Sequence, residues 1–223
     1  MIKTLTTLLA AITMLLAVNS HAADNTDASG QYVAGTDYQV LEKPVRTSDP
    51  KRIEATEVFW YGCSHCYKFE PTVAAWHKTL AEDVVFVRSP AVWHPNMALH
   101  ARAYYTAQVL GVLDTMHLVI FEAMNLKKNA LGSEDAIADL FATHGTNREE
   151  FSKVFNSFGV TSAVKQAEAR QRSYKIEGTP EMIVNGKYRI TGRMGGSYTR
   201  MMKVVDYLIE VERNKLAAST NAS

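Results

Sequence analysis

Short apolar runs and longer stretches of helical periodicity follow one another along the chain. Apolar and β-branched residues crowd 53–61 and predict a strand, and the weak alternation over 38–41 predicts a shorter strand before it. The continuous apolar run at 84–87 is typical of a strand covered on both faces. From Cys66 to Leu80, apolar residues recur at spacings of three and four, which predicts a helix that Pro71 should kink or break.

The stretch from Asn96 to about Tyr174 differs in character, because it contains no proline and indicates one helix after another. Residues that favour N-caps punctuate it, and glycines stand where helices should end. The expected caps are Asn96, Asp114, Ser133 and Asn147, the last with Glu150 as a capping box. The expected end glycines are Gly111, Gly132, Gly145 and Gly159.

A hairpin and a helix should complete the chain. Asn185-Gly186 lies inside the apolar segment 181–190 and predicts two strands joined by a tight turn. Ser197 should begin the last helix, and the polar tail from Asn214 should fray. Strands separated by helices predict an α/β sheet, with the helical block inserted between its halves. The predicted domains are 23–95 together with 175–223, and the all-helical insertion 96–174.

The first 22 residues have the pattern of a secretory signal peptide. Lys3 is the only Lys, Arg, Asp or Glu among them, residues 5–18 are mostly apolar, and small residues precede a cleavage site after Ala22. A retained membrane anchor is the alternative, but a bilayer span needs about 20 apolar residues. We therefore expect cleavage after Ala22 and export into an oxidising compartment.

The exported chain should carry almost no net charge. The full sequence has 24 basic and 23 acidic residues, and removing the leader removes Lys3 and no acid, which leaves 23 of each. Proteins that bind nucleic acid or anionic lipid usually present an excess of basic charge. Neither is expected as a main partner.

Cys63 and Cys66 are the only cysteines, and they directly follow the predicted strand at 53–61. Backbone N–H groups converge where a helix begins and favour an anion, and the thiolate is the reactive form of cysteine. A disulfide across so short a loop adds little to stability, because the constraint on the unfolded chain grows with loop length. The pair therefore predicts a dithiol that exchanges disulfides and needs no other cofactor.

The helix dipole alone cannot make Cys63 strongly acidic. It contributes about 0.3–1 kcal/mol, whereas lowering a pKa by one unit takes about 1.4 kcal/mol. Larger shifts need hydrogen bonds to the sulfur, from the backbone N–H groups of His65 and Cys66, the Ser64 hydroxyl or the His65 ring. An exposed histidine without a role is the alternative reading of His65.

Taken together, these motifs resemble the DsbA-type periplasmic thiol–disulfide oxidoreductases of the thioredoxin superfamily. The resemblance implies a thioredoxin fold interrupted by a helical domain, and a location in the periplasm. It spans nearly the whole exported chain. The segments that carry it are Leu41-Glu42-Lys43-Pro44, Cys63-Ser64-His65-Cys66-Tyr67, Phe69-Glu70, Asn156-Ser157-Phe158, Pro180 and Val184-Asn185-Gly186-Lys187-Tyr188.

The resemblance also assigns roles to single residues. It implies that Cys63 attacks and Cys66 resolves, and that Pro180 is a cis proline facing the pair. It further implies that Glu57 is a buried acid that carries the proton of the resolving thiol. The backbone of Thr179 should then pair with an incoming peptide as a short extra strand.

Two positions depart from the family pattern. Ser64 stands where the family usually has proline, and Thr179 stands where valine is often found. By resemblance, both positions tune the redox potential and the release of substrate. The strength of this protein as an oxidant therefore depends on them.

Other polar residues have simpler readings. From the residues alone, Glu57 fits a strand-edge carboxylate in water as well as a buried acid, and Glu70 fits a solvated charge. The methionines indicate core filling, although Met182 and Met194 are candidates for an adaptable peptide groove. No metal site is expected, because the remaining histidines show no shared ligand spacing; they are His77, His94, His100, His117 and His144.

The leading hypothesis is an enzyme that donates its Cys63–Cys66 disulfide to newly exported, unfolded proteins with free thiols. By resemblance, a membrane quinone reductase of the DsbB type reoxidises it. A reductase or isomerase of the same fold is an alternative, but isomerases usually need a dimer cleft, and this chain shows no dimerisation region and should be a monomer. A metal-binding protein is a remote alternative, because two cysteines leave a tetrahedral site short of ligands. A peptide-binding chaperone without redox turnover is the last.

Overall fold

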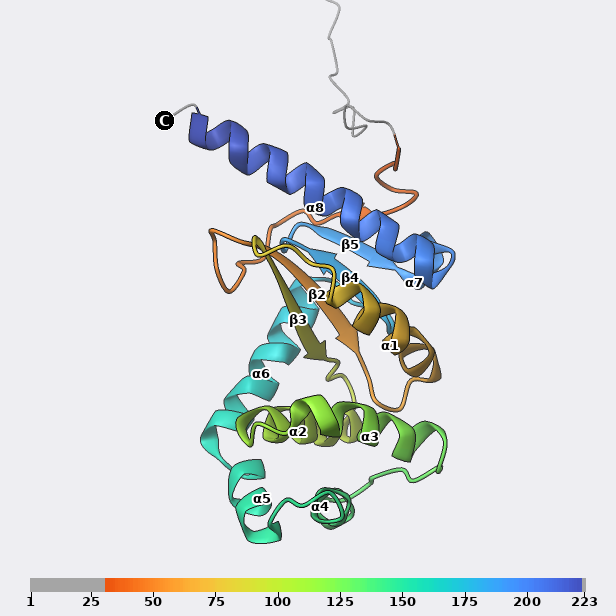
Figure 1. Cartoon of the computed structure of the whole chain (residues 1–223), viewed down its shortest axis with the longest axis vertical. Coiled ribbons are helices and arrows are strands. Elements are labelled where there is room, and N and C mark those ends of the chain that lie inside the picture. Colours follow the sequence, from red (N-terminus) through yellow and green to blue (C-terminus); the bar gives the residue numbers. More distant parts are fainter. Residues whose placement is uncertain (1–30, 222–223) are drawn as a thin grey trace, which may run out of the picture.

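The computed structural model describes residues 31–221 of the 223-residue chain. The predicted signal peptide, residues 1–22, and its cleavage after Ala22 lie outside the described residues. Figure 1 shows a sheet in the middle of the molecule, with the longest helix on one side and a group of helices at the opposite end. Within the described range, no helix joins the length and the apolar content that crossing a bilayer requires.

The sheet has the strand order β1-β5-β4-β2-β3. The C-terminal hairpin of β4 (Glu181–Val184) and β5 (Tyr188–Thr191) pairs antiparallel with β1 (Gln39–Val40) on one side and with β2 (Ile53–Phe59) on the other. Only β3 (Val84–Pro90) runs parallel to its neighbour, which is β2. Because β2 has a partner on both sides and helices above and below, all seven of its residues are buried.

Two helices pack on one face of the sheet. Helix α1 (Ser64–His77) follows β2, and α8 (Tyr198–Asn221) follows the short α7 (Gly192–Gly195) after β5. Their apolar residues, among them Val73 and Val205, form a core with Met182 and Val184 of β4. The other face of the sheet packs against residues that include Met97 and Tyr174.

The helical block forms a second body with its own core. It consists of α2 (Pro95–Val109), α3 (Leu113–Asn125), α4 (Glu134–Ala142), α5 (Arg148–Phe155) and α6 (Phe158–Ser173). The core of this block continues without a break through Phe59 and Tyr61 to Cys66, so the helical block reaches the cysteine pair. The arrangement is the predicted α/β sheet with an all-helical insertion.

Two of the four predicted N-caps are correct. The side chains of Ser133 and Asn147 accept backbone N–H groups at the starts of α4 and α5. Asn96 and Asp114 do not cap, because α2 and α3 begin earlier than predicted. Pro95 occupies the first position of α2, where its missing N–H costs nothing.

The predicted helix ends are also partly wrong. Gly111 and Gly145 follow α2 and α4 in the left-handed region, with φ of +70° and +90°. Gly132 has no such φ, and Gly159 lies inside α6, because Ser157 caps that helix two residues earlier.

Three further differences have physical reasons. Helix α1 runs through Pro71, because proline removes one backbone hydrogen bond while the helix keeps its buried face. Strand β3 is an edge strand with half-buried residues rather than a strand covered on both faces. Helix α8 continues past Asn214, with Arg213 ion-paired to Asp83 and Glu210, and Lys215 to Glu212.

The Asn185-Gly186 turn is confirmed, with φ of +50° and +61° at the two residues. It is held against the segment before β2, because the Val45 N–H donates to the Gly186 carbonyl at 2.8 Å. A Cβ atom on Gly186 would lie 2.0 Å from the Val45 carbonyl oxygen. Glycine is therefore required at this position for both its backbone angle and its lack of a side chain.

We predict that Gly186→Ala destabilises the protein more than Gly111→Ala. Both glycines have positive φ, so each alanine should cost about 1–2 kcal/mol of backbone strain. Only Gly186 lacks room for the added methyl, whereas no atom lies within 4 Å of the Cβ position at Gly111. Urea unfolding of the two variants measures the difference, and equal losses would contradict the packing argument.

Candidate active site

The two cysteines lie at the start of α1 in unequal surroundings. Cys63 is the N-cap residue, and its sulfur accepts the Cys66 N–H at 3.4 Å. Both residues are free thiols; Cys63 is partly exposed and Cys66 is fully buried. The Cys63 sulfur can therefore meet a partner from solvent, whereas the Cys66 sulfur is shielded from it.

Hydrogen bonds lower the pKa of Cys63 from 9.0 to about 5. The largest contribution is the hydrogen bond with the Cys66 thiol; partial burial opposes it, and the Thr179 side chain and the backbone N–H groups of Cys66 and His65 add to it. The predicted backbone donors are therefore in place. Neither the Ser64 hydroxyl nor the His65 ring bonds to the sulfur, so the expectation that these two groups donate to Cys63 is wrong.

The pKa of Cys66 is shifted in the opposite direction. Burial raises it well above its ordinary value, and the hydrogen bond and negative charge of Cys63 raise it further. Near neutral pH the reduced pair therefore holds a thiolate at Cys63 and a thiol at Cys66.

The loop before β4 faces the exposed sulfur. The Thr179–Pro180 peptide bond is cis, as the resemblance implied. The Cys63 thiol lies 3.3 Å from the Thr179 carbonyl oxygen, to which it can donate. This contact brings together two segments that are 116 residues apart.

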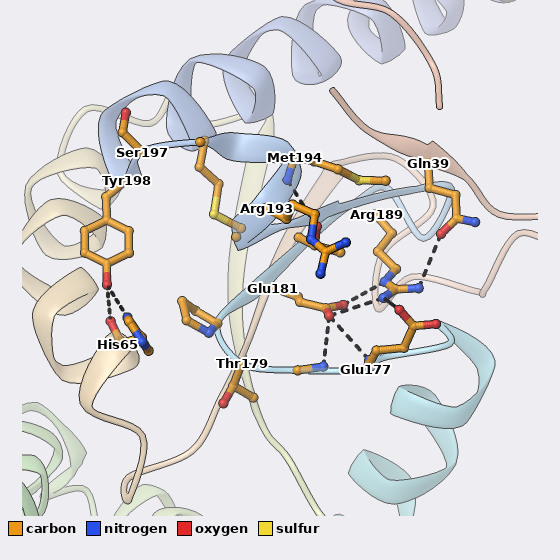
Figure 2. A pocket seen from close by; sticks show the side chains of 16 residues that line it. Gln39, His65, Glu177, Thr179, Glu181, Arg189, Arg193, Met194, Ser197 and Tyr198 are labelled. Atoms are coloured by element: carbon orange, nitrogen blue, oxygen red, sulfur yellow. Dashed lines mark hydrogen bonds and ion pairs between the residues drawn. The ribbon is translucent and has the colours of Figure 1, made fainter. Parts of the chain in front are cut away.

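A buried ion pair supports this loop from behind. Glu181 accepts the Arg189 Nε–H at 2.7 Å, and it also accepts the Gly178 and Glu177 N–H groups at 3.0 and 3.3 Å. Glu181 and Arg189 are 3% and 2% exposed. Arg189 contacts Glu177 and Gln39 as well (Figure 2). The carboxylate thus fixes the two residues that precede Thr179.

A pocket of about 860 Å³ lies between the loop and the start of α8. His65 and Tyr198 stand at one end of it, and the Glu181–Arg189 pair stands at the other (Figure 2). Met194 lines it, as proposed from the sequence. The pocket opens beside the cysteine pair and has room for part of a peptide.

Glu57 is a buried acid in the middle of β2. It is 0% exposed, and its Oε2 atom lies 3.3 Å from Arg88 Nε, while its Oε1 atom has no hydrogen-bond partner. Burial raises the pKa of Glu57 to about 8, against the opposing charge of Arg88; the nearby charges of Glu70 and Cys63 raise it further. The reading of Glu57 as a strand-edge carboxylate in water is wrong.

Several known proteins are similar to this chain over most of its length. The family profile described as DSBA-like thioredoxin domain matches residues 77–203. A Pseudomonas aeruginosa protein named thiol:disulfide interchange protein DsbA is 39% identical over 182 residues, which are 82% of this chain and 86% of that protein. The chain belongs to the DsbA-like family.

Further matches support the same assignment. A protein of that name from Azotobacter vinelandii is 38% identical over 81% of this chain and 84% of its own length. The crystal structure of Pseudomonas aeruginosa DsbA superposes with a TM-score of 0.80, at 39% identity, over 85% of this chain and 97% of that one. The predicted family, the thioredoxin fold with its insertion and the class of thiol–disulfide oxidoreductase are confirmed. The domain boundaries and the roles of single site residues stay predictions.

Met182, a candidate for the peptide groove from the sequence, does not line the pocket in this DsbA-like protein. It is 0% exposed and lies in the core between the sheet and α8. Successive residues of a strand point to opposite faces, so Glu181 faces the pocket and Met182 faces away from it. Thr179 and Pro180 do line the pocket.

Glu70 is buried rather than solvated. Its Oε1 atom lies 2.5 Å from Arg88 Nη2, and its Oε2 atom lies 3.3 Å from His117 Nε2. The other ring nitrogen of His117 lies 2.9 Å from the Tyr61 hydroxyl. Burial lowers the pKa of His117, so the neutral ring bridges the two groups. The expectation failed because α3, which carries His117, covers the face of α1 that carries Glu70.

The insertion also holds the loop before Cys63. Trp60 Nε1–H donates to His100 Nδ1 at 3.0 Å, and Asn125 Nδ2–H donates to the Tyr61 carbonyl at 2.9 Å. A Cβ on Gly62 would lie 2.3 Å from the Trp60 ring, so glycine is needed there. His100, His117 and Asn125 therefore position the active-site loop, which no sequence pattern indicated.

The described part of the chain contains no cluster of three or more His, Cys, Asp or Glu side chains that could hold a metal ion.

The Glu181–Arg189 ion pair is a feature of the site that the sequence analysis missed, although the sequence contained a signal for it. Residues 181 and 189 fall on the same face of the predicted hairpin. Charged side chains are rarely buried unless they are paired, so two opposite charges on one face of a buried strand pair predict an ion pair.

We predict that Glu57→Gln stabilises the reduced protein increasingly as pH rises. The pKa of Glu57 is raised from 4.5 when unfolded to about 8 when folded, so its ionisation opposes folding. The gain in unfolding free energy of the variant over the wild type should be absent below pH 4.5, grow between pH 4.5 and pH 8, and level off above pH 8. Urea unfolding across this range measures it.

Glu54→Gln is the matched control, because Glu54 lies on the same strand and accepts hydrogen bonds from the Ser48 N–H and hydroxyl at 2.8 and 2.6 Å. Its replacement should lose stability at neutral pH. A constant gain for Glu57→Gln from pH 4.5 to 9 would refute the assigned ionisation.

Proposed function

We propose that this DsbA-like enzyme oxidises thiols of newly exported, unfolded proteins in the periplasm by donating its Cys63–Cys66 disulfide. The observation that carries the proposal is the opposed acidity of the two cysteines. Stabilising the Cys63 thiolate favours the reduced dithiol, and by linkage it makes the disulfide a stronger oxidant. Each 1.4 kcal/mol of such stabilisation is worth about 30 mV.

The first step is attack of a substrate thiolate on the accessible Cys63 sulfur. A bond forms between the two sulfurs, the Cys63–Cys66 bond breaks, and the Cys66 sulfur leaves with the electron pair. Because burial strongly disfavours a thiolate at Cys66, this sulfur must take up a proton. Glu57, with a pKa of about 8 and a charge that acts on Cys66, is the acid proposed to supply it.

In the second step, another substrate thiolate attacks the substrate sulfur of the mixed disulfide. The substrate disulfide forms and Cys63 leaves as a thiolate, which its pKa of about 5 makes a good leaving group near neutral pH. Two electrons have then passed from the substrate to the enzyme dithiol. The chemistry needs no cofactor beyond the two sulfurs.

The loop at Thr179 and Pro180 is the proposed binding site for the substrate backbone. The Thr179 carbonyl lies beside the reacting sulfur, and the pocket next to it can take the following residues. A peptide that extends along this loop would pair with it as an added strand. Recognition through the backbone suits substrates that are unfolded and differ in sequence.

The reduced enzyme must be returned to the disulfide before it can act again. Membership of the DsbA-like family supports a membrane quinone reductase of the DsbB type as the proposed oxidant. The signal-peptide pattern of the first 22 residues supports export. The enzyme is further proposed to act as a monomer.

We predict that the reduced protein melts at a higher temperature than the oxidised protein at pH 7.5, and that the difference shrinks towards pH 5. The stability that the thiolate gives to the folded reduced form is complete above the unfolded pKa of 9.0, is still partly present at pH 7.5, and is lost as pH falls through the folded pKa of about 5. Calorimetry of both redox forms tests this. Equal or reversed melting temperatures at pH 7.5 would contradict the proposed direction of electron flow.

The activity itself is tested with an unfolded model protein that carries two free thiols. The oxidised wild type should remove both thiols, and Cys63→Ser should remove none. Cys66→Ser, activated as a mixed disulfide, should transfer to the substrate once without turnover. A wild type that removes no thiols, together with a Cys63→Ser variant that suppresses aggregation of the unfolded protein equally well, would favour a chaperone without redox turnover. Stoichiometric zinc in the reduced protein would favour a metal-binding role.

A further inference from the structure

The hydroxyl of Tyr198 lies against the start of α1 at the mouth of the pocket. It donates to the His65 backbone carbonyl at 3.0 Å, and it lies 3.4 Å from His65 Nδ1 (Figure 2). Tyr198 is the first residue of α8, and its ring packs on Phe69 of α1 with the ring centres 5.1 Å apart. A rigid helix start therefore aims this hydroxyl at His65.

The Tyr198 hydroxyl has a single proton, and this decides whether the His65 ring donates or accepts the hydrogen bond between them. Tyrosine has one O–H donor, which goes to the His65 carbonyl. The ring nitrogen Nδ1 must then be the donor to the Tyr198 oxygen, so its proton is directed away from Cys63. Burial and the charge of Cys63 raise the pKa of Tyr198, so the hydroxyl keeps its proton.

His65 would otherwise be a strong candidate to bond the Cys63 thiolate. It stands two residues from that sulfur on an exposed first turn, and a hydrogen bond to an ionised sulfur is stronger than one between neutral groups. In the described structure the His65 ring bonds to Tyr198 and not to Cys63, and the backbone N–H is the only group of His65 that bonds to the sulfur. Glu181 and Arg189, a charged pair that also lines the pocket, are bonded to each other at its far end.

We propose that Tyr198 is a positioning residue, whose hydroxyl holds the His65 imidazole away from the Cys63 sulfur and so limits the oxidising power of the disulfide. The inference rests on the proposed function. Removing the hydroxyl frees the ring to turn towards the thiolate and stabilise it. The reduced dithiol then becomes more favoured, and the disulfide becomes a stronger oxidant.

The test is Tyr198→Phe, equilibrated with reduced and oxidised glutathione. Two glutathione thiols reduce the Cys63–Cys66 disulfide and leave as one glutathione disulfide, so the equilibrium constant reports the potential directly. It should shift towards the reduced enzyme by on the order of threefold, the size of one weak hydrogen bond, or about 14 mV. The absorbance of the Cys63 thiolate should also persist to lower pH than in the wild type.

Tyr207→Phe is the matched control, because Tyr207 lies on the same helix and its buried hydroxyl has no hydrogen-bond partner in the structure. It should leave the glutathione equilibrium unchanged. No shift for Tyr198→Phe relative to this control, or a shift towards the oxidised enzyme, would overturn the inference.

A double variant separates the ring from the backbone. In a His65→Ala background the Tyr198 hydroxyl still has the carbonyl to bond, but there is no imidazole to hold. Tyr198→Phe should then have no effect on the equilibrium, and a shift as large as in the wild-type background would refute the role given to the ring. A wild-type enzyme that fails to oxidise the unfolded model protein would instead refute the proposed function, whatever Tyr198→Phe does.

Discussion

The whole site depends on hydrogen-bond donors that converge on one half-exposed sulfur while its neighbour stays in the core. Cys63 lies where β2 ends and α1 begins, so unpaired N–H groups of the helix point at it. Cys66, one turn further, falls on the buried face of the same helix and supplies its thiol as an additional donor. The four-residue segment from 63 to 66 therefore separates charge between two identical side chains.

This separation needs a fixed frame on three sides. The sheet supplies Glu57 and Arg88 beneath the pair, and the C-terminal half of the chain supplies the Thr179–Pro180 loop, backed by the Glu181 carboxylate. The insertion supplies the third side through α3, which reaches Tyr61 and Glu70. Each support comes from a different stretch of sequence, and the fold brings them within a few side chains of the sulfur.

Local patterns in the sequence were sufficient for the parts of this site that are themselves local. The C-x-x-C pair, the strand before it and the helix after it follow from adjacent residues, and so does the Asn185-Gly186 turn. Glu70 and Met182 were misread because their surroundings are set by tertiary packing: α3 covers the first, and strand alternation turns the second into the core. His117 and Asn125 gave no signal, since their partners lie 47 to 64 residues away.

The contacts between α3 and the active-site loop have a consequence for how the sequences of related proteins can diverge. His117 and Asn125 stand eight residues apart, or about two helical turns, and both contact Tyr61. The insertion cannot slide or rotate against the sheet without pulling on a residue two positions from the reactive sulfur. Substitutions on the exposed faces of α4 and α5 should accumulate freely, while residues along the inner face of α3 should change only together with the loop they hold.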